Sequence, residues 1–334
     1  MQDQATPPDD PSAPGGAASG ARGHVLMCSM RDEGPFVLEF VAHHRAIGFD
    51  RIFIASNDCR DGTDLLLDAL DRAGAITHYR NRVKPGELPQ HSAYAGIRRR
   101  HGLDAADWLM VLDADEFLDV TSGGGRVQDL TAQADAGDDI IMLNPLTFGT
   151  SRDPRWQPGL VTEQFPLRLP ARHGANRPVK TLARGVGRFR QIHNHSVVGY
   201  RGKDALTVLR ADGSRFAIPP GGKLWEVLRN VPVEDIRHGL AHYNHYAVKS
   251  LASYLLRHDR GRGAAPKGEA NARHTSGYFD RIAAARIRDT GFSGRHGEAL
   301  RAEYARLLAI PEVAAAQAET ERRYGALIAA IMDY

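Results

Sequence analysis

The stretch from Asp107 to Leu118 constrains the fold of this chain more than any other; it reads Asp-Trp-Leu-Met-Val-Leu-Asp-Ala-Asp-Glu-Phe-Leu. Its first half is a short apolar run bounded by charge, which predicts a strand buried on both faces of a sheet. If the strand continues through Asp115, then Asp113 and Asp115 point to one face at its carboxyl end, where open α/β sheets bind ligands. Paired carboxylates there favour Mg²⁺ or Mn²⁺, which would neutralise a departing diphosphate.

The same pattern also has a purely structural interpretation. Asp residues at the ends of strands are common in turns and helix caps, and a bare Asp-x-Asp occurs by chance in many unrelated proteins. Evidence from the residues around the pattern is therefore needed to choose between the two interpretations.

The composition narrows the class of protein. With 334 residues, 42% hydrophobic and 25% charged, the chain can bury a substantial core and is typical of an ordinary globular protein. The net charge of +3 is mild, and the arginines are spread along the chain instead of forming a basic stripe. We therefore expect no nucleic acid as a partner.

Cysteine use and hydropathy predict the compartment. Cys28 and Cys59 are too few for a disulfide framework and form no Cys-x-x-Cys pair, as in proteins of a reducing cytoplasm. No apolar run approaches the length of a membrane span, and the N-terminus lacks the apolar core of a signal peptide. We expect a cytoplasmic protein, with peripheral contact at the inner face of the membrane left open.

The order of predicted elements indicates an α/β fold. Residues 1–23 have almost nothing to bury, which predicts a disordered tail. Apolar runs and amphipathic helical segments then alternate, which predicts a mostly parallel sheet covered by helices. The expected strands are 24–28, 51–55, 75–79, the run that leads to Asp113, and 139–144; the expected helices are 35–46, 63–73, one that ends at 98–100, and 127–134. Further on, we expect an irregular region over 146–258, then a mobile loop and C-terminal helices over 259–334.

Three polar segments follow predicted strands, namely Arg31–Gly34, Asn57–Asp61 and Asp113–Glu116. Because the carboxyl ends of parallel strands meet at one edge of a sheet, these segments predict a nucleotide site. Neither a Gly-x-Gly-x-x-Gly nor a P-loop motif follows the first strand, so a metal is expected to take more of the phosphate charge. The alternative is that these side chains only shape turns and helix starts.

In order and spacing, these segments resemble the GT-A glycosyltransferases of family 2, in particular the family 2-like branch that is related to family 92. The resemblance is carried by residues 30–36, 39–50, 56–63 and 111–117. It implies a GT-A (Rossmann-like) mostly parallel mixed sheet covered by helices. It also implies that residues 24–145 are the nucleotide-sugar-binding half and residues 146–258 the acceptor-side half of the same domain.

The resemblance assigns roles to individual residues. It implies that the loop with Arg31 and Glu33 and the turn with Asn57, Asp58 and Asp61 hold the donor nucleoside. Asp113 and Asp115 are implied to hold Mn²⁺ or Mg²⁺ and the donor diphosphate.

Downstream, the resemblance continues more weakly. It implies that His195 or His245 adds a metal ligand, and Lys180 and Lys249 could contact the diphosphate or only form surface ion pairs. If extended, His193 and His195 share a face; if helical, so do His242, His245 and Lys249.

The function implied is a metal-dependent, inverting glycosyltransferase of polysaccharide biosynthesis. It would move a sugar from a nucleotide-sugar donor, UDP-linked by expectation, to a hydroxyl of a glycan or lipid-linked acceptor. Glu163 is the first candidate for the base that takes the acceptor proton, and Asp153 is the second. The sequence makes no prediction of the sugar or of the oligomeric state.

Two other functions fit parts of the pattern. In a haloacid-dehalogenase-like phosphotransferase Asp113 would be the nucleophile, although Phe117 stands where that motif usually has a small Thr or Val. A non-catalytic glycan- or nucleotide-binding module would keep the fold without turnover.

Overall fold

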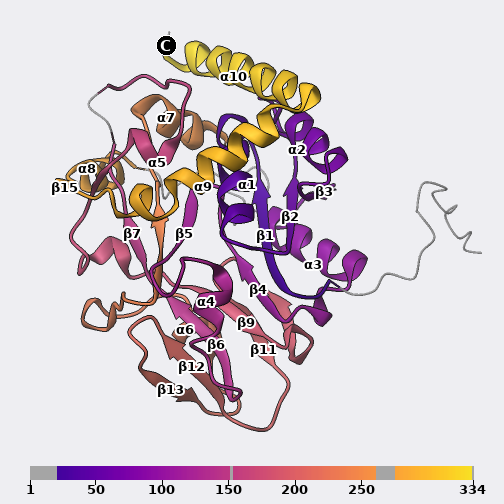
Figure 1. The fold of residues 1–334 in the computed structure, drawn as a ribbon, viewed down its shortest axis with the longest axis vertical. Helices are drawn as coiled ribbons and strands as arrows, with labels where there is room; N and C mark the ends of the chain where they lie inside the picture. Colours follow the sequence, from indigo (N-terminus) through magenta and orange to yellow (C-terminus); the bar gives the residue numbers. More distant parts are fainter. Residues whose placement is uncertain (1–20, 151–152, 261–274, 333–334) are drawn as a thin grey trace, which may run out of the picture.

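The computed structural model describes residues 21–150, 153–260 and 275–332. Its main sheet has eight strands in the order β13-β12-β6-β9-β4-β1-β2-β3 (Figure 1). The strands are β1 (His24–Met30), β2 (Arg51–Ser56), β3 (Thr77–Arg80), β4 (Trp108–Val111), β6 (Asp138–Leu143), β9 (Lys180–Arg184), β12 (Leu206–Arg210) and β13 (Arg215–Ile218). Strands β4, β1, β2 and β3 are mutually parallel, β9 is antiparallel to both of its neighbours, and β12 is parallel to β6.

A smaller sheet lies beside the main one. It consists of β5 (Glu116–Val120), β14 (Ala241–His245) and β7 (Pro145–Thr147), with β14 in the middle. Two short antiparallel pairs complete the strands, β10 (Phe189–Ile192) with β11 (Val197–Tyr200) and β8 (Leu167–Arg168) with β15 (Ile287–Arg288). Because β5 follows β4 after a short turn, this turn joins the two sheets.

Helices cover both faces of the main sheet. The longer ones are α1 (Gly34–Ala46), α2 (Thr63–Arg72), α3 (Pro89–His101), α7 (Leu251–Arg260), α8 (Ser276–Ala283), α9 (Gly291–Leu308) and α10 (Pro311–Met332). Three of about one turn are α4 (Val127–Thr131), α5 (Val161–Gln164) and α6 (Leu224–Val227). α1 packs against α2, α9 and α10, and α3 packs against β1 and β2 from the other face (Figure 1). None of the helices in the described ranges is both long enough and apolar enough to cross a bilayer.

The alternation of side chains along β1 explains why the sheet is covered twice. Leu26, Cys28 and Met30 belong to the core under α1, whereas Val25 and Met27 belong to the core under α3. All five are buried. A strand with apolar side chains on both faces is stable only between two helical layers, since leaving such a side chain in water costs roughly 1.5–3 kcal/mol.

The structure confirms the predicted α/β class, with a large mixed sheet flanked by helices, an architecture that fits the GT-A-like fold. The tail predicted over residues 1–23 lies outside the described residues up to position 20. Ala21 is buried, and Gly23 donates its backbone N–H to Asp107, so the folded part already includes residues 21–23. Strands β9 and β12, which follow the predicted division at 145/146, belong to the same sheet as β1. Most of the predicted loop after residue 259 also lies outside the described residues.

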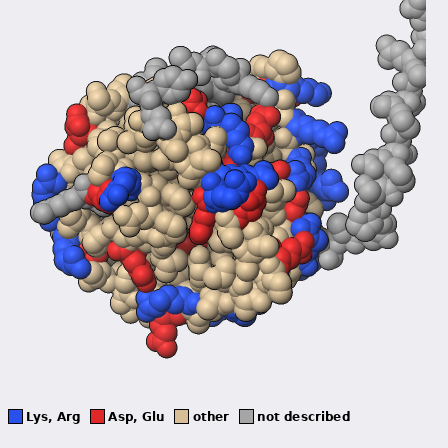
Figure 2. All heavy atoms as spheres, turned by 90° about the horizontal axis from the view of Figure 1, so that it is seen from above, with Lys and Arg blue, Asp and Glu red and all other residues tan. Residues whose placement is uncertain are grey.

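Charges of both signs lie on one face of the molecule. Figure 2 shows Lys and Arg interspersed with Asp and Glu on the face seen from above.

Candidate functional site

The loop that follows β1 and the turn that follows β2 are joined by a buried carboxylate. Asp61 accepts hydrogen bonds from the backbone N–H groups of Gly34 (2.7 Å) and Thr63 (2.9 Å) and from the Thr63 hydroxyl (2.6 Å). Glu33 in turn donates its backbone N–H to Thr63 Oγ1 (2.9 Å). Burial raises the pKa of Asp61 above its ordinary value, although these donors oppose the shift. Asp61 therefore fixes the starts of α1 and α2 at the edge of the sheet.

The two aspartates of the Asp-x-Asp pattern lie on a turn. The strand does not continue through Asp115, the condition considered in the sequence, because β4 ends at Val111 and β5 begins at Glu116. The turn is closed twice: Glu116 donates its N–H to the Asp113 carbonyl (3.0 Å), and its side chain accepts from the Asp113 N–H (2.9 Å). The aspartates nevertheless remain at the carboxyl end of β4, next to β1.

Asp113 is held by a lysine from β9 and a glutamine from α3. Lys180 Nζ lies 3.1 Å from Asp113 Oδ2 and 2.8 Å from Glu116 Oε2, and Gln90 donates to Asp113 Oδ1 (3.0 Å). The Lys180 side chain is 1% exposed, whereas that of Asp113 is 29% exposed. Burial alone would raise the pKa of Asp113, but the Lys180 ammonium group brings it below its ordinary value. Burial raises the pKa of Glu116 to about 7 against the opposing effect of Lys180. Asp113 thus presents a charged carboxylate to solvent.

Asp115 is buried and held from the C-terminal side of the chain. Arg257 of α7 donates through Nη1 to Asp115 Oδ2, and His245 Nε2 of β14 lies 3.6 Å from the same oxygen. The backbone also contributes, since Tyr246 donates its N–H to the Asp115 carbonyl (2.8 Å). Burial opposes ionisation, yet Arg257 and then His245 hold the pKa of Asp115 well below its usual range. Asp115 is therefore a buried anion with a fixed cationic partner.

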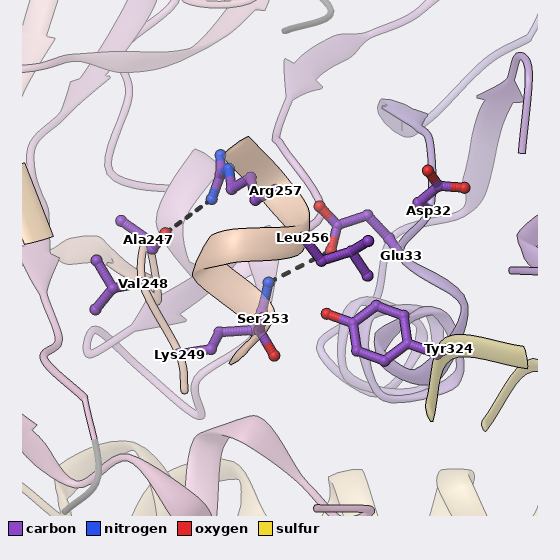
Figure 3. A pocket seen from close by; sticks show the side chains of 9 residues that line it. All are labelled: Asp32, Glu33, Ala247, Val248, Lys249, Ser253, Leu256, Arg257 and Tyr324. Atoms are coloured by element: carbon purple, nitrogen blue, oxygen red, sulfur yellow. Dashed lines mark hydrogen bonds and ion pairs between the residues drawn. The ribbon is translucent and has the colours of Figure 1, made fainter. Parts of the chain in front are cut away.

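A pocket adjoins this cluster between the loop after β1 and α7. Asp32, Glu33, Lys249 and Arg257 are its charged lining residues, and Tyr324 of α10 closes one side (Figure 3). Lys249 Nζ lies 3.4 Å from Glu33 Oε2 and 4.2 Å from the centre of the Phe36 ring. The pocket is thus lined by two carboxylates, two cations and one aromatic ring.

Backbone strain coincides with this edge of the sheet. Among the residues that the structure describes, three non-glycine residues have positive φ: Asp32 (50°), Asp58 (50°) and Lys249 (51°). Each belongs to a segment predicted to bind the donor. Positive φ costs roughly 1 kcal/mol or more for a residue such as Lys and persists where the surroundings enforce it, often at ligand sites.

The predicted histidines are only partly brought together. His245 reaches Asp115 from a strand, because residues 241–245 form β14 and not the helix considered in the sequence. His195 lies in the turn between β10 and β11, where its Nδ1 pairs with the Val179 carbonyl (2.8 Å). Burial and then the nearby Lys180 lower the pKa of His195 to about 4, so its imidazole is neutral at pH 7. His193 pairs with His91 (2.8 Å between Nε2 atoms) and packs on Trp225.

The predicted divalent cation does not fit the arrangement of these side chains. Within residues 21–150, 153–260 and 275–332, no group of three or more His, Cys, Asp or Glu side chains could hold a metal ion. Both carboxylate oxygens of Asp113 and Oδ2 of Asp115 are bonded to Gln90, Lys180 and Arg257 instead.

The remaining candidates lie on loops and short elements. Arg31 follows β1 and Asn57 follows β2, where Asn57 donates to Asp58 Oδ2 (3.3 Å). Glu163 of α5 accepts from Arg301 of α9 (2.8 Å), and its side chain is 45% exposed. Asp153 forms a local ion pair with Arg155 (2.8 Å).

Sequence reasoning missed two residues of the cluster, Gln90 and Arg257, and it placed Glu116 in a polar segment without giving it a role. Glu116 adjoins the aspartates and could have been suspected from its position. Arg257 could not, because its contact with Asp115 spans 142 positions.

Comparisons with known proteins find similarity over part of the chain. No protein-family model matches the chain. A glycosyltransferase family 92 protein of Ricinus communis is 28% identical over 121 residues, which cover 36% of this chain and 21% of that protein. One of Oryza sativa subsp. japonica is 29% identical over 96 residues, which cover 28% of this chain and 16% of that protein. The match thus spans about a fifth of the length of these curated relatives.

Two solved structures resemble the chain at low identity. Staphylococcus aureus TarS 1–349 in complex with UDP-GlcNAc has 10% identity and a TM-score of 0.28, covering 41% of this chain and 37% of that one. The mannosyltransferase PcManGT of Pyrobaculum calidifontis in complex with GDP-Man and Mn²⁺ has 13% identity and a TM-score of 0.31, covering 88% and 73%. These likenesses are too low to transfer any residue role. The family 92 matches support the placement of this chain in the glycosyltransferase superfamily.

Proposed function

We propose that this chain transfers a sugar from a nucleotide-sugar donor to a hydroxyl of a glycan or lipid-linked acceptor. The observation that carries the proposal is the convergence of three loops at the carboxyl ends of the parallel strands β1, β2 and β4. There the carboxylate of Asp113 and the cations Lys180, Lys249 and Arg257 lie at one edge. This edge is where open α/β sheets bind nucleotides.

The proposed chemistry is one displacement at the anomeric carbon. The acceptor oxygen forms a bond to that carbon while the bond to the donor diphosphate oxygen breaks, and the acceptor proton passes to a base. Attack from the opposite face inverts the configuration. The departing nucleoside diphosphate keeps the bonding electron pair, and preorganised side-chain cations stabilise the charge that develops on it.

The finer assignments rest on the family resemblance. We propose a UDP-linked donor, with the nucleoside between the loop of Arg31 and Glu33 and the turn of Asn57 to Asp61. A role in polysaccharide biosynthesis, a cytoplasmic location and peripheral contact with a membrane remain predictions from the sequence.

A donor panel tests the proposal. UDP- and GDP-sugars are screened by thermal shift and calorimetry, with donor hydrolysis and transfer as further readouts. We expect one donor to raise the melting temperature by mass action, since ligand at 100 times its Kd adds about 2.7 kcal/mol. Asp113→Asn should lose turnover, whereas Asp104→Asn, at an exposed carboxylate that pairs with Arg98, should not.

Two outcomes would contradict the proposal. One is the absence of any response to nucleotide sugars. The other is hydrolysis of p-nitrophenyl phosphate by the wild type that Asp113→Asn abolishes, which would favour a phosphotransferase.

A further inference from the structure

A side-chain cation occupies the position that the sequence assigned to a metal. Arg257 Nη1 donates both to Asp115 Oδ2 and to the carbonyl oxygen of Ala247, the latter at 3.0 Å. A carboxylate and a carbonyl oxygen are the ligand types of a hard divalent ion. Here they surround a guanidinium group instead, whose side chain is 23% exposed and lines the pocket (Figure 3).

The guanidinium group is anchored but retains donors. Both hydrogen bonds that the structure describes for Arg257 are made by Nη1. Among the described residues, Nε and Nη2 therefore have no assigned acceptor, although a guanidinium group carries five N–H donors in a fixed fork. Such a fork binds two oxygens of a phosphate group at once.

A second cation faces the same pocket. Lys249 is 5% exposed as a residue, and its ammonium group lies between the Glu33 carboxylate and the Phe36 ring. Its strained backbone, with φ of 51°, fixes the direction in which the side chain leaves the chain. Asp115 and Glu33 thus act as positioning residues, because each holds one cation in place by an ion pair.

We propose that Arg257 and Lys249 bind the donor diphosphate directly, in place of a divalent metal ion. This inference rests on the proposed function and makes it more specific. Placing a metal on Oδ2 of both Asp113 and Asp115 would displace Lys180 and Arg257 from buried ion pairs, and each displaced charge would lose its compensation in a poorly solvated site. A nucleoside diphosphate, in contrast, can accept the unused donors of Arg257 without any such displacement.

Calorimetric titration with UDP and with uridine tests the inference, each in excess EDTA and in Mn²⁺. We expect UDP to bind with the same Kd within about twofold in both conditions. Arg257→Met should weaken UDP binding by roughly 30-fold, as expected for the loss of charge-assisted hydrogen bonds, and leave uridine binding unchanged. Arg322→Met, at an exposed ion pair with Glu319, is the matched control and should bind UDP like the wild type.

A double variant separates ligand binding from folding. Arg257→Met leaves Asp115 buried without its cation, so Arg257→Met combined with Asp115→Asn removes both charges of the pair. We expect this double variant to recover the melting temperature but not the affinity for UDP. Recovery of UDP affinity would show that Arg257 serves only to balance Asp115 and would overturn the inference.

The metal dependence distinguishes the two levels of the proposal. If UDP binds only in Mn²⁺, the inference fails while the proposed function stands. If neither UDP nor GDP binds in either condition, both fail.

Discussion

Lys180 Nζ lies 3.1 Å from Asp113 Oδ2, although the two residues are 67 positions apart in the chain. The contact exists because β9 is antiparallel to β4 and its first residue therefore lies beside the end of β4, where the turn begins. One lysine in the interior of the sheet thus sets the charge of the turn that carries both aspartates.

Lys180→Met is expected to destabilise the fold. The substitution keeps the length of the side chain but leaves Asp113 and Glu116 without their shared cation, and breaking a buried pair costs roughly 3–5 kcal/mol. Urea denaturation at pH 7 measures the loss in the free energy of unfolding. Lys223→Met, in an exposed pair with Glu226, should change that free energy by about 0.5 kcal/mol or less. A Lys180→Met protein as stable as the wild type would show that the ion pair has no net effect on folding.

The buried carboxylate of Glu39 should make stability depend on pH. It accepts from the N–H of Val161 (2.7 Å) and from the N–H and hydroxyl of Thr162 (3.0 and 2.7 Å), and burial raises its pKa from 4.5 to about 7. The folded state therefore binds the proton more tightly than the unfolded state. This contribution is fully present below pH 4.5 and is lost as the pH rises through 7, by up to about 3 kcal/mol.

Urea denaturation at pH 5 and pH 7.5 checks this prediction. Between these two values, Glu39→Gln should lose less stability than the wild type does, because the amide does not titrate. Glu298→Gln, at an exposed position of α9, is the matched control and should follow the wild type. Equal pH slopes for Glu39→Gln and the wild type would contradict the prediction.

The buried carboxylate of Asp119, in β5, attaches α9 to the small sheet. Asp119 is fully buried and accepts from Arg295 Nε (2.9 Å), while His296 Nε2 lies at 3.1 Å and His242 Nε2 at 3.2 Å. Burial opposes ionisation, but the hydrogen bonds from His242, His296 and Arg295 hold the pKa of Asp119 far below its ordinary value. Its contribution to stability is therefore present above pH 4 and is lost as the pH falls towards that lowered pKa.

Asp119→Asn should therefore lower the free energy of unfolding by about 3–5 kcal/mol at pH 7. Thermal unfolding measures the loss, and hydrogen exchange should locate it in α9 and β14. Asp135→Asn, whose side chain is 80% exposed, should leave both readouts unchanged. Unaltered exchange in α9 after Asp119→Asn would contradict this assignment.

Local patterns were enough to predict the first half of the fold. Each apolar run from β1 to β4 is complete within one segment, and the helices between them have their own turn signals, such as Gly48 with φ of 97° after α1. The expected helix over 35–46 and the observed α1 differ by one residue. The predicted polar strand ends adjoin β1, β2 and β4 because parallel neighbours end at the same edge.

The second half depended on contacts that no local pattern reveals. β14 pairs with β5 across more than a hundred positions, so the sequence around His242 and His245 did not show whether it forms a strand or a helix. The cationic partners of the aspartates, Lys180 and Arg257, are likewise fixed by tertiary packing. An Asp-x-Asp pattern predicts that the two aspartates lie at an edge of the sheet. It does not predict which cation pairs with them.

The two carboxylates predicted as the catalytic base are expected to be dispensable. Arg155 holds the pKa of Asp153 at about 2, which makes this carboxylate a weak base at neutral pH. Glu163 is bonded to Arg301 at an exposed position of α5, whereas the proposed site lies at the ends of β1, β2 and β4. Glu163→Gln and Asp153→Asn should therefore keep kcat/KM for sugar transfer within about threefold of the wild type. A loss of about 100-fold in either variant, with unchanged donor affinity, would identify that carboxylate as the base, because general base catalysis contributes roughly that factor or more.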